Sequence, residues 1–70
     1  MSQQTQKLIK MINQIADNIS ATLDEDKAAE IIATHVRKFW AKPMKDDIRK
    51  YLETGGAELT ARAKRAVQLL

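Results

Sequence analysis

Apolar residues recur along this chain at intervals of three and four positions, and they nowhere alternate with polar residues over the length of a strand. Such spacing places them on one side of an α-helix, whereas a half-buried strand would need a period of two. Glycine and proline occur only three times, and each occurrence falls between two apolar stripes. The pattern therefore predicts an all-α protein.

We predict four short amphipathic helices, over residues 5–20, 25–40, 43–53 and about 60–70, packed as a small antiparallel bundle. Residues 1–4 are expected to fray, which leaves residues 5–70 as a single helical domain. In an alternative arrangement, the first helix stands apart from the others and pairs with another chain. A chain of 70 residues is too short for a second domain.

Each predicted helix has an apolar stripe that should face the core. In the first helix this stripe consists of Leu8, Ile12, Ile15 and Ile19, widened by Ile9 and Ala16. In the second it consists of Ala28, Ile32, His35 and Phe39, flanked by Ile31 and Val36. In the third it consists of Met44, Ile48, Tyr51 and Leu52, and in the last of Ala63, Ala66, Val67 and Leu70. Arg62, Lys64 and Arg65 are expected to face water or a partner.

The ends of these helices carry local signals. Asp24 and Thr60 are suited to capping the amides at the start of the second and fourth helices. Pro43 lacks an amide hydrogen, so it ends the second helix and fits the first turn of the third. Gly55 and Gly56 can adopt the left-handed conformation that ends a helix, which explains them better than a phosphate-binding loop does.

Charge divides the chain into two halves. Residues 1–34 hold three basic and five acidic side chains, whereas residues 35–70 hold nine basic and four acidic ones. A basic half of this kind indicates either an ordinary solvated surface or an acidic partner. The absence of cysteine is consistent with a cytoplasmic protein, and no apolar run is long enough to span a membrane.

Little in the sequence supports catalysis or cofactor binding. There is no cysteine and only one histidine, and no phosphate-binding or nucleophile motif is present. Asp46 and Asp47 are adjacent, so on a helix they point about 100° apart and make a poor catalytic pair. We expect no catalysis and no bound cofactor or metal in this chain. We expect His35 to be a packed core residue.

The segment "HVRKFW", residues 35–40, concentrates the only histidine, phenylalanine and tryptophan of the chain beside two cations. Phe39 should continue the inward stripe, while Trp40 either covers the corner between two helices or projects outward. One interpretation is an aromatic plug with cations suited to the end of a helix. The other is a partner-binding anchor formed by Trp40 and Arg37, since these residue types dominate interface hot spots.

Nucleic-acid binding is the alternative that charge suggests. Basic residues and three aromatic residues lie around a turn between two helices, loosely like a helix-turn-helix. Against this, Asp46 and Asp47 occupy the first turn of the candidate recognition helix, where DNA phosphates would repel them. We therefore do not expect a nucleic-acid partner.

Three stretches, "NQIADNI", "HVRKFWAKPMK" and "GGAEL", occur in an order that resembles the delta subunit of NAD-dependent, molybdenum-containing formate dehydrogenases. The resemblance covers about residues 7–70. The positions that fit the pattern are Asn13, Gln14, Ile15, His35, Arg37, Phe39, Trp40, Met44, Gly55, Gly56 and Leu59. In one departure, Lys42 and Pro43 appear in exchanged order, which shifts the start of the third helix by one residue.

The resemblance implies an accessory subunit of a cytoplasmic complex, which assists its assembly, stability or cofactor maturation. In that family the molybdenum pterin cofactor, iron–sulfur clusters, FMN and NAD belong to the larger subunits. The partners that the resemblance implies are these larger subunits. We expect no membrane partner. We expect docking through His35, Arg37, Lys38, Phe39, Trp40 and Met44. An isolated chain could also self-associate through an apolar face that lacks its partner.

Overall fold

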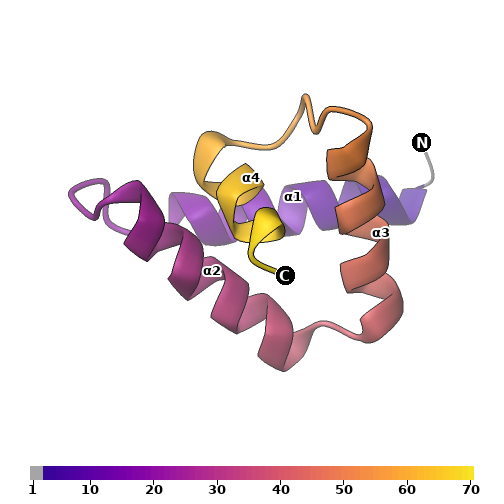
Figure 1. Cartoon of the computed structure of the whole chain (residues 1–70), viewed down its shortest axis with the longest axis horizontal. Helices are drawn as coiled ribbons and strands as arrows, with labels where there is room; N and C mark the ends of the chain where they lie inside the picture. Colours follow the sequence, from indigo (N-terminus) through magenta and orange to yellow (C-terminus); the bar gives the residue numbers. More distant parts are fainter. Residues whose placement is uncertain (1–2) are drawn as a thin grey trace.

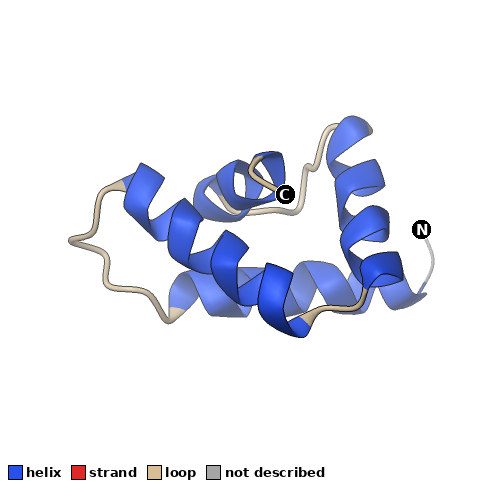
Figure 2. Ribbon diagram, turned by 60° about the horizontal axis from the view of Figure 1, so that its bottom comes forward, coloured by secondary structure: helices blue, strands red, loops and turns tan. Residues whose placement is uncertain are grey.

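The computed structural model describes residues 3–70 of the chain. They form four helices, α1 (Gln3–Asp17), α2 (Glu25–Phe39), α3 (Lys42–Glu53) and α4 (Ala61–Gln68), and no strand is present within this range (Figures 1 and 2). The all-α prediction is confirmed. The predicted fraying of residues 1–4 falls partly on residues 1 and 2, which lie outside the described residues, and α1 begins at Gln3.

The helices form a compact body of 33 × 24 × 17 Å. α4 packs most extensively against α2, and α1 lies behind both and contacts the other three helices (Figure 1). α3 stands steeply across α1 in both ribbon views instead of lying alongside it, so the helices do not share one bundle axis. α1 is therefore part of the core, and the alternative of a first helix that stands apart is wrong.

Every helix contributes side chains to a single core. Its most deeply buried large side chains are Ile12 from α1, Ile32 and Val36 from α2, and Ile48 from α3, each with no exposed surface. α4 contributes Ala63 and Ala66, which are also fully buried and allow α2 to approach closely. The predicted stripes of α1, α3 and α4 face this core, with Ile15, Ile19, Met44, Leu52 and Leu70 only partly buried at its edge.

The predicted cap residues act as expected. The side chain of Asp24 accepts a hydrogen bond from the amide of Asp26, and Thr60 accepts one from the amide of Ala63. These bonds satisfy amides that the first turn of a helix leaves without a carbonyl partner. They fix where α2 and α4 begin.

The turn after α3 depends on its two glycines. Gly55 and Gly56 have φ angles of 118° and 60°, in the region that side chains with a Cβ rarely adopt. The amide of Gly55 donates to the carbonyl of Leu52, which ends the helix as predicted. At the other end, α3 begins at Lys42, one residue before the predicted start at Pro43.

Arg62 departs from the prediction that it faces water or a partner. Its half-buried guanidinium donates hydrogen bonds to the carbonyl oxygens of Ile19, Ser20, Ala21 and Leu23, at 3.0–3.3 Å. These carbonyls belong to the loop between α1 and α2, which extends away from the body in Figure 2. One α4 side chain thereby ties this loop to the core.

Candidate docking surface

The two adjacent aromatic residues at the end of α2 have opposite environments. The side chain of Trp40 is 5% exposed and belongs to the core cluster, together with Val36 and Ile48. The side chain of Phe39 is 72% exposed. The prediction that Phe39 continues the inward stripe is therefore wrong. For Trp40 two positions were predicted as alternatives, and in the structure it covers the corner between α2 and α3.

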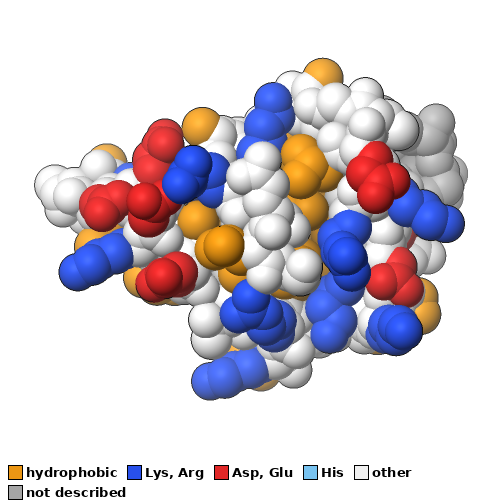
Figure 3. Space-filling view, in the orientation of Figure 1, with side chains coloured by type: hydrophobic (Ala, Val, Ile, Leu, Met, Phe, Trp, Pro, Cys, Tyr) orange, Lys and Arg blue, Asp and Glu red, His pale blue; other side chains and the backbone are white. Residues whose placement is uncertain are grey.

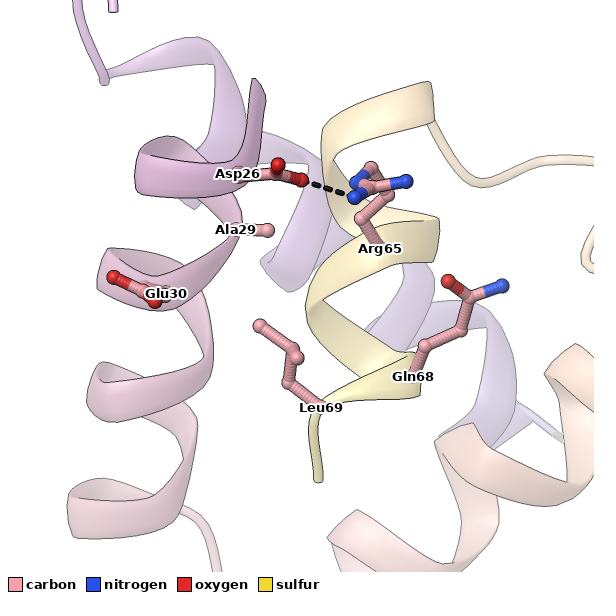
Figure 4. A pocket seen from close by; sticks show the side chains of 6 residues that line it. All are labelled: Asp26, Ala29, Glu30, Arg65, Gln68 and Leu69. Atoms are coloured by element: carbon pink, nitrogen blue, oxygen red, sulfur yellow. Dashed lines mark hydrogen bonds and ion pairs between the residues drawn. The ribbon is translucent and has the colours of Figure 1, made fainter. Parts of the chain in front are cut away.

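The rotational position of α2 about its own axis explains why Trp40, and not Phe39, is buried. Its buried residues are Ala28, Ala29, Ile32, Ala33 and Val36, and Trp40 follows at the same four-residue spacing. Relative to the predicted stripe, the inward face is rotated towards the alanines by about 70°, so that Ala28 and Ile32 stay buried while His35 and Phe39 turn outward. Ala29 points towards α4 in Figure 4. Small side chains on both helices permit close packing. Hydropathy alone does not reveal this buried face, because alanine is only weakly hydrophobic.

His35 and Phe39 stack on the outer surface of α2. Their ring centroids lie 4.8 Å apart with the planes tilted by 43°, and both side chains are exposed. His35 was predicted to be a packed core residue, and this is wrong for the same reason. One turn earlier, Ile31 is 48% exposed. We call Ile31, His35 and Phe39 the outer stripe.

A basic hollow lies where α2 ends and α3 begins, on a different side of α2 from the outer stripe. Its volume is about 260 Å³, and its lining consists of Arg37, Lys42, Lys45, Asp46, Arg49 and Leu70. Lysine and arginine side chains gather over this part of the surface, whereas acidic ones gather near the start of α2 (Figure 3). None of the four cations forms an ion pair with a carboxylate in residues 3–70. Their charge is available to an acidic partner.

Arg37 also connects the ends of two helices. Its guanidinium donates a hydrogen bond to the carbonyl oxygen of Leu69, which directly follows α4. A cation in the last turn of α2 is favourable for the helix dipole as well. Arg37 is therefore held in place at the edge of the hollow, and its remaining donors face the surface.

The six residues expected to bind a partner divide into two groups. His35, Arg37, Lys38 and Phe39 are exposed, and Arg37 lies on a different side of α2 from His35 and Phe39. Trp40 is buried, and Met44 is half-buried and packs against the core. Arg37 lines the basic hollow, His35 and Phe39 face another side of α2, and Trp40 and Met44 support the corner from inside.

A family model for the NADH-dependent formate dehydrogenase delta subunit, FdsD, matches residues 7–67. The chain belongs to this family. The match spans all of α2, α3 and the turn between them, so the segment containing the outer stripe and most of the basic hollow falls within it. No curated protein and no solved structure matches the chain.

Residues that carry the resemblance to the delta subunit family also hold the fold together. The side-chain amide of Asn13 donates to the carbonyl of Glu58, at 2.8 Å, and its oxygen accepts from the amide of Thr60, at 3.1 Å. Asn13 thereby fixes the loop before α4, a role that sequence reasoning missed. The sequence signal for this role was a single amide side chain at the border of the apolar stripe of α1.

Other parts of the described surface show fewer features of a binding site. A pocket of about 300 Å³ lies between α2 and α4, and the ion pair of Asp26 with Arg65 bridges its rim (Figure 4). Within residues 3–70, no three His, Cys, Asp or Glu side chains are grouped so that they could hold a metal ion. In the same range, no helix is long and apolar enough to cross a membrane.

Proposed function

We propose that this delta subunit family member is a non-catalytic subunit that docks onto the larger subunits of a cytoplasmic formate dehydrogenase. The observation that carries the proposal is the exposed Phe39, stacked on His35, at the same end of α2 as a hollow whose cations lack ion-pair partners within residues 3–70. Docking assists the assembly, stability or cofactor maturation of the complex. Its molybdenum pterin, iron–sulfur, FMN and NAD chemistry belongs to the larger subunits.

Phe39 is the anchor of this docking. Burying a largely exposed phenylalanine in an apolar pocket contributes roughly 1.5–3 kcal/mol to binding, more than a surface ion pair does. His35 stacks on the ring and restricts its rotamers, so less side-chain entropy is lost on binding. Trp40 acts from inside, because its burial sets the direction in which α2 presents Phe39.

The basic hollow supplies the second part of the surface. Arg37, Lys42, Lys45 and Arg49 match an acidic region of the partner, which accelerates association and selects orientation. Such attraction between exposed charges weakens as salt screens them. We therefore expect salt to slow the association of the subunits more than it speeds their dissociation.

Co-purification tests the proposal. The chain is expressed together with the larger subunits, and the amount recovered with them is measured for wild type, Phe39→Ala and the double variant Lys42→Glu/Lys45→Glu. Both variants should be recovered at a tenth of the wild-type amount or less. The controls are Met11→Ala, which removes another exposed apolar side chain, and Lys7→Glu/Lys10→Glu on α1.

Unchanged recovery of both test variants, with helical content retained, would refute this docking surface. Retention of the isolated chain on duplex DNA, with a steep dependence on salt, would favour nucleic-acid binding instead. The cofactor content and the dissociation rate of the complex then separate structural support from cofactor maturation. A complex without the delta subunit that holds full cofactor but dissociates faster points to support, whereas one that is stable but lacks molybdenum points to maturation.

A further inference from the structure

The basic hollow holds more positive charge than the chain itself neutralises there. Its four cations are accompanied by one carboxylate, that of Asp46, which leaves an excess of three positive charges. The side chains of Lys42, Lys45 and Arg49 form no hydrogen bond and no ion pair within residues 3–70. Because like charges held together repel one another, an anion placed in the hollow is attracted by all of them at once.

Two helices direct these cations into the same small volume. On α3 they recur at positions 42, 45 and 49, and together with Asp46 they lie within an arc of about 100° on one face of the helix. From α2, Arg37 reaches the same hollow, and its bond to the carbonyl of Leu69 holds it there. An arginine has five N–H donors, so Arg37 retains donors for a ligand.

The size and charge of the hollow favour a pyrophosphate group. Its volume of about 260 Å³ is small for an organic ligand, and its excess charge is more than one carboxylate balances. Two linked phosphoryl groups carry about three negative charges near neutral pH and accept hydrogen bonds on several sides. Arginine binds phosphoryl oxygens in pairs, whereas lysine binds them as a point charge.

The surroundings of the hollow give no support for a nucleic-acid strand. The exposed rings of His35 and Phe39 lie on a different side of α2, and both Trp40 and Tyr51 are buried. Proteins that bind single strands usually stack bases on aromatic side chains, and no such platform adjoins the hollow in residues 3–70. What the hollow offers a ligand is contact with phosphoryl oxygens.

We propose that the basic hollow binds a pyrophosphate group, as inorganic pyrophosphate or as the diphosphate of a nucleotide. Arg37 and Arg49 bind phosphoryl oxygens from the two helices, and Lys42 and Lys45 neutralise the remaining charge. Asp46 repels the ligand and limits its affinity. This binding belongs to the isolated chain and does not depend on docking. Because the proposed docking uses the same cations, pyrophosphate competes with the larger subunits.

Isothermal titration calorimetry of the full chain with sodium pyrophosphate tests the site, at about 0.1 M salt and without divalent cations. Wild type should bind one pyrophosphate with a Kd of about 0.1 mM or lower. Lys45→Gln and Arg49→Gln should each weaken binding about tenfold, because each removes a charge-assisted contact. The control Lys7→Gln/Lys10→Gln removes two positive charges from α1 and should leave the Kd within about twofold.

Asp46→Asn is a test with the opposite sign. It removes the one carboxylate that lines the hollow, so binding should become about tenfold tighter, which loss of folding cannot imitate. Arg49→Lys keeps the charge without the planar pair of donors, and its Kd should lie between those of wild type and Arg49→Gln. Unchanged circular dichroism of every variant shows that the fold is retained.

Titration with ADP distinguishes the two sources of the ligand. Binding at least as tight as that of pyrophosphate supports the diphosphate of a nucleotide. Binding more than about tenfold weaker supports inorganic pyrophosphate, since a nucleoside would then obstruct the site.

Absence of saturable binding up to about 5 mM pyrophosphate would overturn the proposal. So would an unchanged Kd for Asp46→Asn, or a control on α1 that weakens binding as much as the test variants. Duplex DNA or a glutamate-rich peptide that binds the hollow more tightly than pyrophosphate would also overturn it. The peptide result would leave the proposed docking intact, whereas a pyrophosphate site in a chain that is not recovered with the larger subunits would refute docking alone.

Discussion

Phe39 and Trp40 are neighbours in the sequence and similar in hydropathy, yet one is 72% and the other 5% exposed. Consecutive residues at the end of a helix differ by about 100° in direction, so one inward aromatic residue turns the next one out. Burial gives Trp40 its contribution to folding, whereas exposure leaves Phe39 free for binding. The difference teaches that, of two adjacent aromatic residues, one can support the core while the other stays exposed, where we propose that it docks a partner.

The arginines of α4 repeat this contrast. Arg62 is half-buried and binds four carbonyl oxygens of the loop between α1 and α2. Arg65 lies three residues further on and pairs with Asp26, with half of its side chain exposed. The two side chains have the same chemistry, and their partners and exposure decide how much each contributes to the fold.

The largest effect is expected from Trp40→Ala. Loss of a buried tryptophan costs about 3–5 kcal/mol through lost transfer free energy and the cavity left behind. A chain of this length is stabilised by roughly 4–10 kcal/mol in total, so most of its stability would go. Urea unfolding followed by circular dichroism measures the change. A loss below about 1 kcal/mol would mean that Trp40 does not support the corner.

Arg62→Ala should destabilise the fold by about 2 kcal/mol, because hydrogen bonds to a charged group contribute about 1.5–3 kcal/mol. Arg62→Lys should recover only part of this loss, since an ammonium group cannot reproduce the planar array of donors. The same unfolding experiment applies, and amide hydrogen exchange in residues 18–24 should increase. Unchanged exchange there would contradict the role assigned to Arg62.

Arg65→Ala should cost no more than about 1 kcal/mol, since exposed ion pairs contribute little. The loss should shrink further in high salt, which screens the pair in wild type. Thermal unfolding of wild type and variant at low and high ionic strength measures both effects. If Arg65→Ala destabilised the protein as much as Arg62→Ala, exposure would not explain the difference between the two arginines.

The smallest effect on folding is expected from Phe39→Ala. Exposed side chains outside special contacts usually change stability by no more than about 0.5 kcal/mol. The midpoint of urea unfolding should therefore stay near that of wild type, while recovery with the larger subunits falls. A destabilisation similar to that of Trp40→Ala would place Phe39 among the folding residues and remove the contrast between the two neighbours.

Local signals predicted much of the fold. Asp24, Thr60 and Gly55 determine helix ends through bonds with residues close by in the sequence, so their roles could be inferred without the rest of the chain. The apolar stripes of α1, α3 and α4 were also recognisable, because isoleucine, leucine and valine mark the inner face clearly. The family resemblance rested on motifs that include Asn13 and the segment at residues 35–40, which the family match covers.

The candidate surface was predicted only in part. The sequence indicated the segment at residues 35–40, but it assigned Phe39 to the core and left Trp40 undecided. Two stripes on α2 were compatible with a helical period, and alanine carries too little hydropathy to distinguish them. Nor did the sequence suggest Ile31 as a surface residue or Arg62 as a clamp for a distant loop, since both depend on which helix lies alongside.

The sequence by itself determined that this chain is helical, where its second and fourth helices begin, where its third helix ends, and that its second half is basic. These properties follow from backbone conformation, capping and composition, which act within a few residues. Only the tertiary structure decided which face of α2 is buried, because that depends on close packing of its alanines against α4. Because this face of α2 is buried, Trp40 lies in the core and Phe39 lies on the surface.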